Sequence, residues 1–544
     1  MTPLKLIGTW IDAVVFDLGR QMRWTFLPPL MIYFAAGFSG LTMIVGTFFV
    51  KEYLDLSAAY LAGLAFWAGL PWALKMPLGH LVDIFWRWKW LLVYLGAGLI
   101  GLSVFIMYLV LTQPEIMRAV MPTSAWYVTS YLLAPSGLVI QDAVADAMSV
   151  EAVPRFDANG DAITLEDSRA MHTTMQTLGR FALISGTVAV AVLNIYMFSG
   201  IEALDAAAKS ATYADIYLAA LLIPLVSVSG VLLASVQKIR LRRNLLRNGL
   251  SDAEADTLFE RPDEKTTPNP WYFIGGAGFV ALSLSIGLGN VPYGQEIIFA
   301  GSMVIVLLLM RQLVSVLDPA SARALIGTAV VIFIFRATPR PGDGLTWFEI
   351  DVLKFDQQFL SILSLITSVL TLVGMVVLRP LMANRPIVYI VVLLTLAAGL
   401  LSLPNIGLYY GIQNITAAMT GGVVDARFIA ILDTAIESPL GQIAMIPMLA
   451  WIARNAPPNL KATFFAVMAS FTNLALSASS LFTKYLNEVF LITREVTDPA
   501  TGAVTTPADY SDLGVLLILV TALTVGVPLI AVALVQNSRL RTPD

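Results

Sequence analysis

Apolar residues run along this chain in repeated stretches of about twenty, separated by short polar segments. A helix of about 20 residues is long enough to cross the hydrocarbon core of a bilayer. About fourteen such stretches can be counted, and we interpret each one as a membrane-spanning helix. Their approximate ranges are 27–50, 58–75, 90–112, 125–149, 173–197, 213–236, 271–290, 295–311, 322–338, 357–378, 386–403, 426–452, 461–485 and 511–536.

The beginning of the chain has a different pattern. Leu4, Ile7, Ile11 and Val14 recur at helical spacing, with polar residues between them. This spacing is typical of an amphipathic helix that lies on the membrane surface. We therefore expect residues 1–26 to be a surface segment before the first span, and not a cleaved signal peptide.

Composition supports the membrane assignment and excludes several functions. The 544 residues are 57% hydrophobic and 13% charged, whereas a soluble domain carries about 25% charged residues. The chain has no cysteine, which excludes disulfides and thiol catalysis. No catalytic triad, phosphate-binding loop, metal-ligand spacing or nucleic-acid motif is recognisable. We expect no enzymatic activity, no cofactor, no metal and no nucleic-acid partner.

The distribution of basic residues predicts the orientation. Most of the 33 Lys and Arg residues fall in the loops that alternate with the apolar stretches in one register. Basic loops remain on the cytoplasmic side, and an even number of spans places both termini there. We expect a bacterial inner-membrane protein with cytoplasmic termini. The basic residues of the longest polar break, 237–270, are interpreted as determinants of orientation and lipid contact.

A weak internal repeat divides the chain. Leu54–Leu61 and Leu353–Leu360 each follow a span and carry a helix-starting residue, Ser57 or Asp356, between two leucines. The repeat predicts two related six-helix halves, an arrangement that transporters use to bind solute near the bilayer midplane. The expected domains are 1–26, a first bundle at 27–236, a linker at 237–270, an inserted hairpin at 271–316, a second bundle at 317–538 and a tail at 539–544.

Charged residues within the spans are the candidate functional residues. Asp142 and Asp146 are one turn apart on one helix face, and Asp433 and Glu437 repeat this spacing in the second half. A carboxylate in hydrocarbon costs at least a few kcal/mol unless it faces protein or water. These residues therefore indicate either a polar path or ion pairs that hold the helices together.

Two arginines are the expected counter-charges. Asp142 and Arg180 lie at a similar depth, about 11–12 Å from the same membrane face, so we predict that they pair. Arg336 is the expected counter-charge of Asp433. The carboxyl groups are candidates for proton uptake, and the guanidinium groups are candidates for binding the carboxylates of a substrate. Purely structural ion pairs remain the alternative.

The segment from Gly79 through Asp83 to Arg87 resembles the loop after the second span in the major facilitator superfamily. The resemblance implies the superfamily fold, an all-α membrane protein with two six-helix bundles, here with the inserted hairpin. It also implies that Lys75, Gly79, Asp83 and Arg87 belong to a cytoplasmic gate, in which an aspartate meets a helix end and an arginine.

Further motifs are similar to those of the folate–biopterin transporter branch of that superfamily. They are Pro71-Trp72, Gln141-Asp142-Ala-Val-Ala-Asp146, Ala337-Thr-Pro339, Gly441-Gln-Ile-Ala-Met-Ile-Pro447 and the segment Ala462–Asn473. Lys461 stands where the branch usually has an acid. The resemblance implies a folate-like or pterin-like solute.

We expect a monomeric secondary transporter that moves a small anionic organic solute by alternating access, coupled to protons, within the lipid bilayer. Two alternatives stay open. One is a membrane assembly or pigment-handling factor built on the same fold, and the other is a muropeptide or nutrient permease. An assembly factor would purify with a stoichiometric protein partner, whereas a transporter would purify alone.

Overall fold

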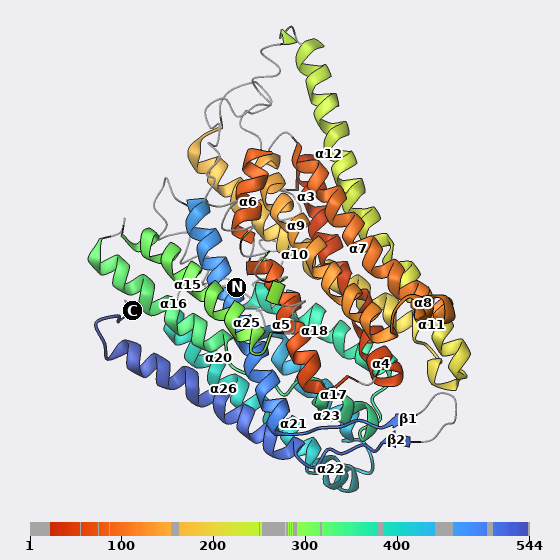
Figure 1. The fold of residues 1–544 in the computed structure, drawn as a ribbon. Helices are drawn as coiled ribbons and strands as arrows, with labels where there is room; N and C mark the ends of the chain where they lie inside the picture. Colours follow the sequence, from red (N-terminus) through yellow and green to blue (C-terminus); the bar gives the residue numbers. More distant parts are fainter. Residues whose placement is uncertain are drawn as a thin grey trace, which may run out of the picture.

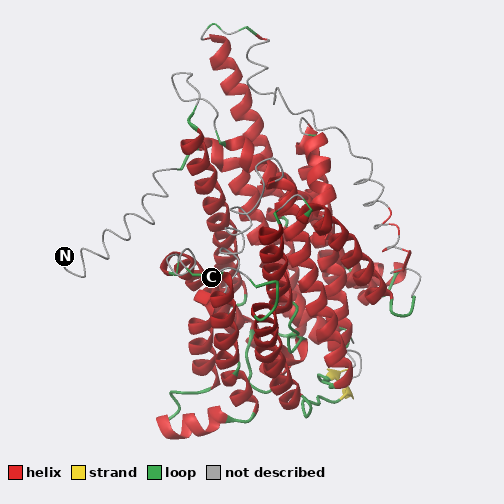
Figure 2. Ribbon diagram, turned by 90° about the vertical axis from the view of Figure 1, so that its left-hand side faces the viewer, coloured by secondary structure: helices red, strands yellow, loops and turns green. Residues whose placement is uncertain are grey.

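The computed structural model describes residues 22–54, 56–73, 75–85, 88–153, 163–247, 291–315, 318–378, 385–440, 461–497 and 504–541, with a few single positions between 249 and 286. Nearly all of this part is helical (Figure 2). Eight of its helices are long and apolar enough to cross a membrane. These findings confirm the predicted all-helical membrane protein. Most of 1–26, of the linker and of the first hairpin helix lies outside the described residues.

The helices keep the order of the predicted spans. They are α3 (Leu27–Phe38), α4 (Met43–Tyr53), α5 (Ala58–Ala73), α6 (Lys75–Ile84), α7 (Lys89–Thr112), α8 (Pro114–Val120), α9 (Thr123–Ala152), α10 (Leu165–Met197), α11 (Ala206–Ala220), α12 (Leu222–Arg247), α15 (Gly294–Val314), α16 (Pro319–Arg336), α17 (Asp343–Asp351), α18 (Gln357–Val377), α20 (Ile387–Leu401), α21 (Leu403–Tyr409), α22 (Ile412–Thr420), α23 (Ala426–Glu437), α25 (Lys461–Val489) and α26 (Leu513–Gln536). Short 3-10 turns are η2 (Trp24–Phe26), η3 (Ser39–Thr42), η5 (Ile201–Ala203) and η6 (Ser438–Leu440).

The two predicted helix-starting residues of the repeat are confirmed. The Ser57 hydroxyl accepts the backbone N–H of Tyr60 at 3.1 Å where α5 begins. The Asp356 carboxylate accepts the backbone N–H of Phe359 at 2.7 Å where α18 begins. Each side chain satisfies a backbone donor that the first turn of a helix leaves free.

Contacts between helices form one group before the linker, which we call the first half, and one after it, which we call the second half. Before the linker, α7 packs along α9, and α3 packs along both α10 and α12; after it, α26 packs along α16 and α20 (Figure 1). Two long contacts cross between these groups: α5 runs along α25, and α10 runs along α18. Because α5 and α18 begin at equivalent points of the repeat, these two contacts form a nearly symmetric seam.

Helix α15, the second helix of the predicted hairpin, lies along this seam against α5 and α25. The Gln295 amide donates to the Gly63 carbonyl at 3.0 Å, and Ile298 is fully buried in a cluster with Phe66 and Leu481. The opposite face carries exposed apolar side chains such as Val304 and Leu308. α15 therefore has one face for the protein and one for lipid.

Several elements depart from the predicted spans. Helix α6 continues to Ile84, so Gly79 lies in a helix and not in a loop, which corrects the loop expected to begin at Gly79. Short helices α17, α21 and α22 occur where loops are expected. Antiparallel strands β1 (Val496–Thr497) and β2 (Val504–Thr506) pair before α26. All of these are short elements between spans, where the apolar pattern carries little information.

Glycines allow α3 and α10 to cross closely. A Cβ atom at Gly37 would lie 1.8 Å from the Leu183 carbonyl oxygen, and one at Gly186 would lie 2.3 Å from the Phe34 carbonyl oxygen. Small residues at such crossings let backbones approach, which is how helices gain packing energy where lipid offers no hydrophobic driving force.

We predict that Gly186→Ala destabilises the protein by about 1–3 kcal/mol, because the backbone atoms in contact can move apart only with the whole helix. Gly98→Ala in α7 is the matched control, since no atom of another element lies within 4 Å of its added Cβ. Thermal unfolding of both variants in one detergent checks this. Equal melting temperatures would contradict the close crossing.

Candidate functional site

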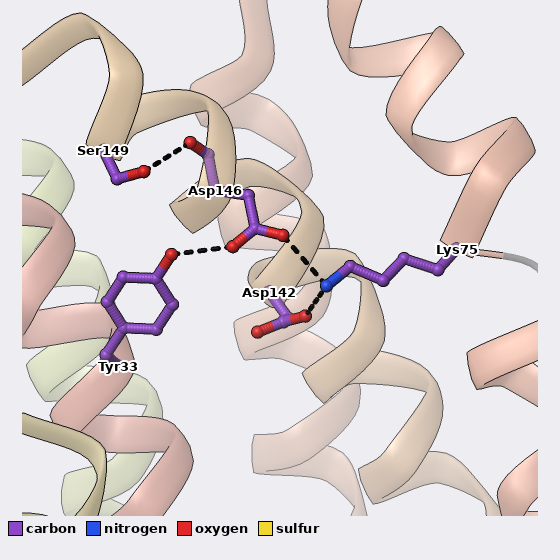
Figure 3. Close-up of polar contacts among 5 residues, drawn as sticks. All are labelled: Tyr33, Lys75, Asp142, Asp146 and Ser149. Carbon is purple, nitrogen blue, oxygen red and sulfur yellow. Dashed lines mark hydrogen bonds and ion pairs between the residues drawn. The ribbon is translucent and has the colours of Figure 1, made fainter. Parts of the chain in front are cut away.

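A three-helix cluster of charged and polar groups forms around α9 (Figure 3). Lys75, the first residue of α6, places its Nζ 2.6 Å from Asp142 Oδ2 and 2.9 Å from Asp146 Oδ2. From α3, the Tyr33 hydroxyl donates to Asp146 Oδ1 at 2.7 Å. The i,i+4 spacing predicted one carboxylate face, and the structure shows that one ammonium group bridges it.

The two carboxylates differ in access. The Asp142 side chain is 16% exposed, whereas the Asp146 side chain is 47% exposed. A half-exposed charge within a span costs little free energy where it contacts water rather than lipid. Asp146 therefore lies at the accessible side of the cluster, and Asp142 lies at its protected side.

The orientation of α9 is fixed by a neighbouring polar residue. Gln141 is buried, and its amide donates to Ser227 Oγ at 2.9 Å and to the Val93 carbonyl at 3.2 Å. These bonds tie α9 to α12 and α7 on one side, which leaves the next residue, Asp142, directed toward Lys75. The long aliphatic stem of lysine spans the gap from α6.

The structure contradicts the predicted pair of Asp142 with Arg180. The direct ion-pair partner of Asp142 is Lys75, and Arg180 acts on Asp142 only as a more distant charge. In the part of the chain that the structure describes, Arg180 forms no ion pair or hydrogen bond through its side chain. Equal depth on consecutive spans was not sufficient, because it does not fix the direction of a side chain around the helix axis.

The second acidic pair has a different environment. Asp433 is 8% exposed, the amide of Asn405 on α21 lies 3.5 Å from its Oδ2, and no described group bonds its Oδ1. Glu437 follows one turn later. Asp433 is thus a buried carboxyl group without a cation among the described residues.

The predicted pair of Asp433 with Arg336 is also wrong. The positive charge that acts on Glu437 is that of Arg340. The charge that acts on Arg336 is also that of Arg340, so Arg336 faces a like charge and not an acid. Within the described residues, Arg336 has no salt bridge. The chain turns away from α16 after Ala337, and Ser479 on α25 fixes this turn by donating to the Thr338 carbonyl at 2.6 Å. Sequence spacing alone does not reveal such a turn.

Glu349 on α17 is a further member of the second group. Burial, and secondarily the negative charge of Asp433, raise the pKa of Glu349 to about 7. Neither Glu349 nor Tyr33 has a sequence signal for its role, since one lies in an expected loop and the other is a single aromatic residue in an apolar span.

The predicted cytoplasmic gate residues have separate outcomes. Lys75 bridges the carboxylates of the cluster, and Gly79 is helical. The Asp83 side chain and Arg87 lie outside the described residues, so their gate role stays a prediction. Among the residues that the structure describes, no group of three or more His, Asp or Glu side chains is placed to hold a metal ion.

Comparisons with known proteins agree with this fold. The model of the BT1 family matches residues 167–542. A curated folate-biopterin transporter of Synechocystis sp. (strain PCC 6803) is 24% identical over 498 residues, covering 89% of this chain and 81% of that protein.

Solved transporter structures share the fold. A POT family transporter in complex with 5-aminolevulinic acid aligns with a TM-score of 0.59 at 12% identity, over 94% of this chain and 96% of that one. The peptide transporter POT in complex with sulfate aligns with a TM-score of 0.58 at 14% identity, over 95% and 96%. The nucleoside transporter NupG aligns with a TM-score of 0.52 at 11% identity, over 94% and 98%.

We predict strong coupling between Lys75 and Asp142 in a double-mutant cycle. Breaking a fully buried ion pair costs about 3–5 kcal/mol, and partial exposure reduces the expected cost of Lys75→Gln or Asp142→Asn to about 1–3 kcal/mol. The double variant should cost less than the sum. Arg180→Gln combined with Asp142→Asn is the control and should be nearly additive. Unfolding free energies check both cycles, and additivity of Lys75 with Asp142 would contradict the bridge.

Proposed function

The chain belongs to the BT1 family, as the match over residues 167–542 shows, and from this premise we propose that it is a proton-coupled secondary transporter for a folate-like or pterin-like anion. Transport across a membrane follows from the family and the fold. The solute class is supported by the Synechocystis relative, which is a folate-biopterin transporter. The coupling ion and the alternating-access cycle are proposed from the charges within the spans.

The proposal of an anionic solute rests on two arginines that have no acidic partner among the described residues. Arg180 on α10 and Arg336 on α16 come from opposite sides of the seam, and neither has an ion pair among the described residues. An isolated charge within a bilayer-spanning bundle costs several kcal/mol. A solute carboxylate offers a compensating charge, and the planar guanidinium group suits bidentate binding of it.

The acidic groups are proposed to carry the proton. Asp433 has a buried oxygen without a donor, and the charged residues that interact with it electrostatically, Glu437 and Glu349, are also acidic. Two neighbouring carboxylates in a low dielectric are much more stable when one of them holds a proton. Asp142 and Asp146 both pair with Lys75, whereas no cation among the described residues pairs with Asp433, so the proton is assigned to the second half.

We predict that the arginines are needed for solute binding but not for stability. Folate at one hundred times its dissociation constant should raise the free energy of unfolding by about 2.7 kcal/mol. Arg180→Gln and Arg336→Gln should abolish this gain, while the melting temperature without ligand stays the same or rises, because an uncompensated charge has been removed. A thermal-shift assay with folate, biopterin and a dipeptide checks this.

Arg311→Gln is the matched control, since Arg311 is an exposed arginine near the end of α15. It should leave the folate response unchanged. If Arg180→Gln and Arg336→Gln instead lower the melting temperature without ligand and keep the folate response, the two arginines are structural. A thermal response to the dipeptide alone would favour a nutrient permease.

We predict that Asp433→Asn retains exchange of folate across the membrane but loses folate accumulation driven by a pH gradient. Asparagine keeps the shape of the side chain but cannot take up a proton at neutral pH. Proteoliposomes that contain this variant should still exchange labelled folate across the membrane, yet should not accumulate it in response to an imposed pH gradient. The measurement is counterflow and gradient-driven uptake side by side. Gradient-driven uptake equal to that of the unmodified chain would remove Asp433 from the coupling site.

A further inference from the structure

At one end of the bundle (Figure 1), the short helix α17 packs against α5 and reaches α4 through an ion pair of Asp351 with Lys51. Trp347 is 1% exposed and belongs to the apolar cluster of the first half, together with Phe49 and Tyr127. The next residue, Phe348, contacts the rings of Tyr409 and Tyr510 in the second half. Consecutive residues of one helix therefore pack into different halves.

Arg494 crosses the seam at the same place. It follows α25 in the second half and is 3% exposed. Its Nε donates to the Lys51 carbonyl at 3.0 Å, and its Nη1 donates to the Leu56 carbonyl at 2.8 Å, both in the first half. Its guanidinium carbon lies 4.8 Å from the ring centre of Trp347. One planar cation thus holds two backbone acceptors and covers the tryptophan.

An ion pair lies beside this contact. Lys51 Nζ on α4 is 2.5 Å from Asp351 Oδ1 on α17, and the Tyr510 hydroxyl donates to Asp351 Oδ2 at 2.5 Å. The side chains of Lys51 and Asp351 are 15% and 21% exposed. Because the pair is shielded from water, it contributes more than a surface ion pair would.

A third connection joins an amide, a hydroxyl and a carboxylate. The Gln357 amide at the start of α18 donates to the Tyr213 hydroxyl at 2.9 Å, and Tyr213 on α11 donates to the Glu52 carboxylate at 3.3 Å. Tyr213 is fully buried and Gln357 is 3% exposed. This chain of hydrogen bonds also joins the two halves at the α17 end.

We propose that Arg494 and the Lys51–Asp351 pair form a latch that seats α17 across the seam and holds this end of the protein closed. Opening requires the Arg494 side chain to leave the carbonyls of Lys51 and Leu56 and requires Trp347 to leave its apolar pocket. The role of this opening in solute movement rests on the proposed function, but the latch itself rests only on the contacts described above.

Distance measurements between spin labels test the latch. The chain has no cysteine, so introduced cysteines are the only labelling sites. Exposed positions Ala203 and Val423 report the α17 end, one from each half. Arg494→Gln should shift the ratio of short to long distances by about tenfold toward long, since hydrogen bonds to a charged group are strong. Asp351→Asn, which preserves shape, should shift it in the same direction by a smaller factor.

Arg427→Gln is the matched control. Arg427 also contacts a carboxylate, Asp356 at 2.6 Å, a carbonyl, Lys354 at 3.0 Å, and a ring, Phe359 at 5.0 Å, but all of these lie in the second half. It should leave the Ala203–Val423 distance unchanged. Unchanged distances in Asp351→Asn, or equal shifts in Arg427→Gln and Arg494→Gln, would overturn the latch, and Asp351→Asn decides the question even if Arg494→Gln does not fold.

A second label pair separates the latch from the proposed function. Val150 and Arg385 are exposed at the opposite end of the bundle. If the two ends alternate, Arg494→Gln lengthens the Ala203–Val423 distance and shortens the Val150–Arg385 distance. A longer distance at the α17 end with no change at the other end supports the latch and argues against alternating access.

Discussion

A charge within a membrane-spanning bundle must be compensated by another helix, and the arrangement of this protein depends on how that requirement is met. In the first half it is met by Lys75, whose ammonium group lies between Asp142 and Asp146. Because the three residues belong to α6 and α9, neither helix can rotate without exposing a carboxylate or the ammonium. The apolar packing of the bundle sets the separation of these helices, and the ion pairs set their rotation.

The second half meets the same requirement incompletely. The charge of Glu437 acts on Asp433 and that of Asp433 acts on Glu349, while Arg336 and Arg340 make no salt bridge among the described residues. An uncompensated set of charges is unfavourable in a protein at rest and useful in one that binds ions and solutes. From this contrast we propose a structural task for the lysine cluster and a binding task for Arg180, Arg336 and the acidic groups on α17 and α23.

Sequence reasoning recovered what depends on local pattern. Apolar length identified the spans, and the spacing of Ser57 and Asp356 identified two helix starts in equivalent positions. Sequence reasoning failed to identify the ion-pair partners, because these depend on the direction of each side chain across the bundle. Depth placed Arg180 level with Asp142, yet Lys75 is the partner, since α6 continues the second span and brings a long side chain to α9. Helix α17 was missed because nine residues give too short an apolar pattern.

That missed helix connects the proposed latch to the acidic group. Trp347 and Asp351 are one turn apart on α17 and therefore share a face, which the Arg494 and Lys51 contacts hold. Glu349 lies between them in sequence, about 200° around the axis from Trp347, and is the residue on which the charge of Asp433 acts. A movement that separates Trp347 and Asp351 from their contacts must also move Glu349, because all three belong to one helix. We therefore propose that protonation of the acidic group and closure of the α17 end are coupled through this one helix.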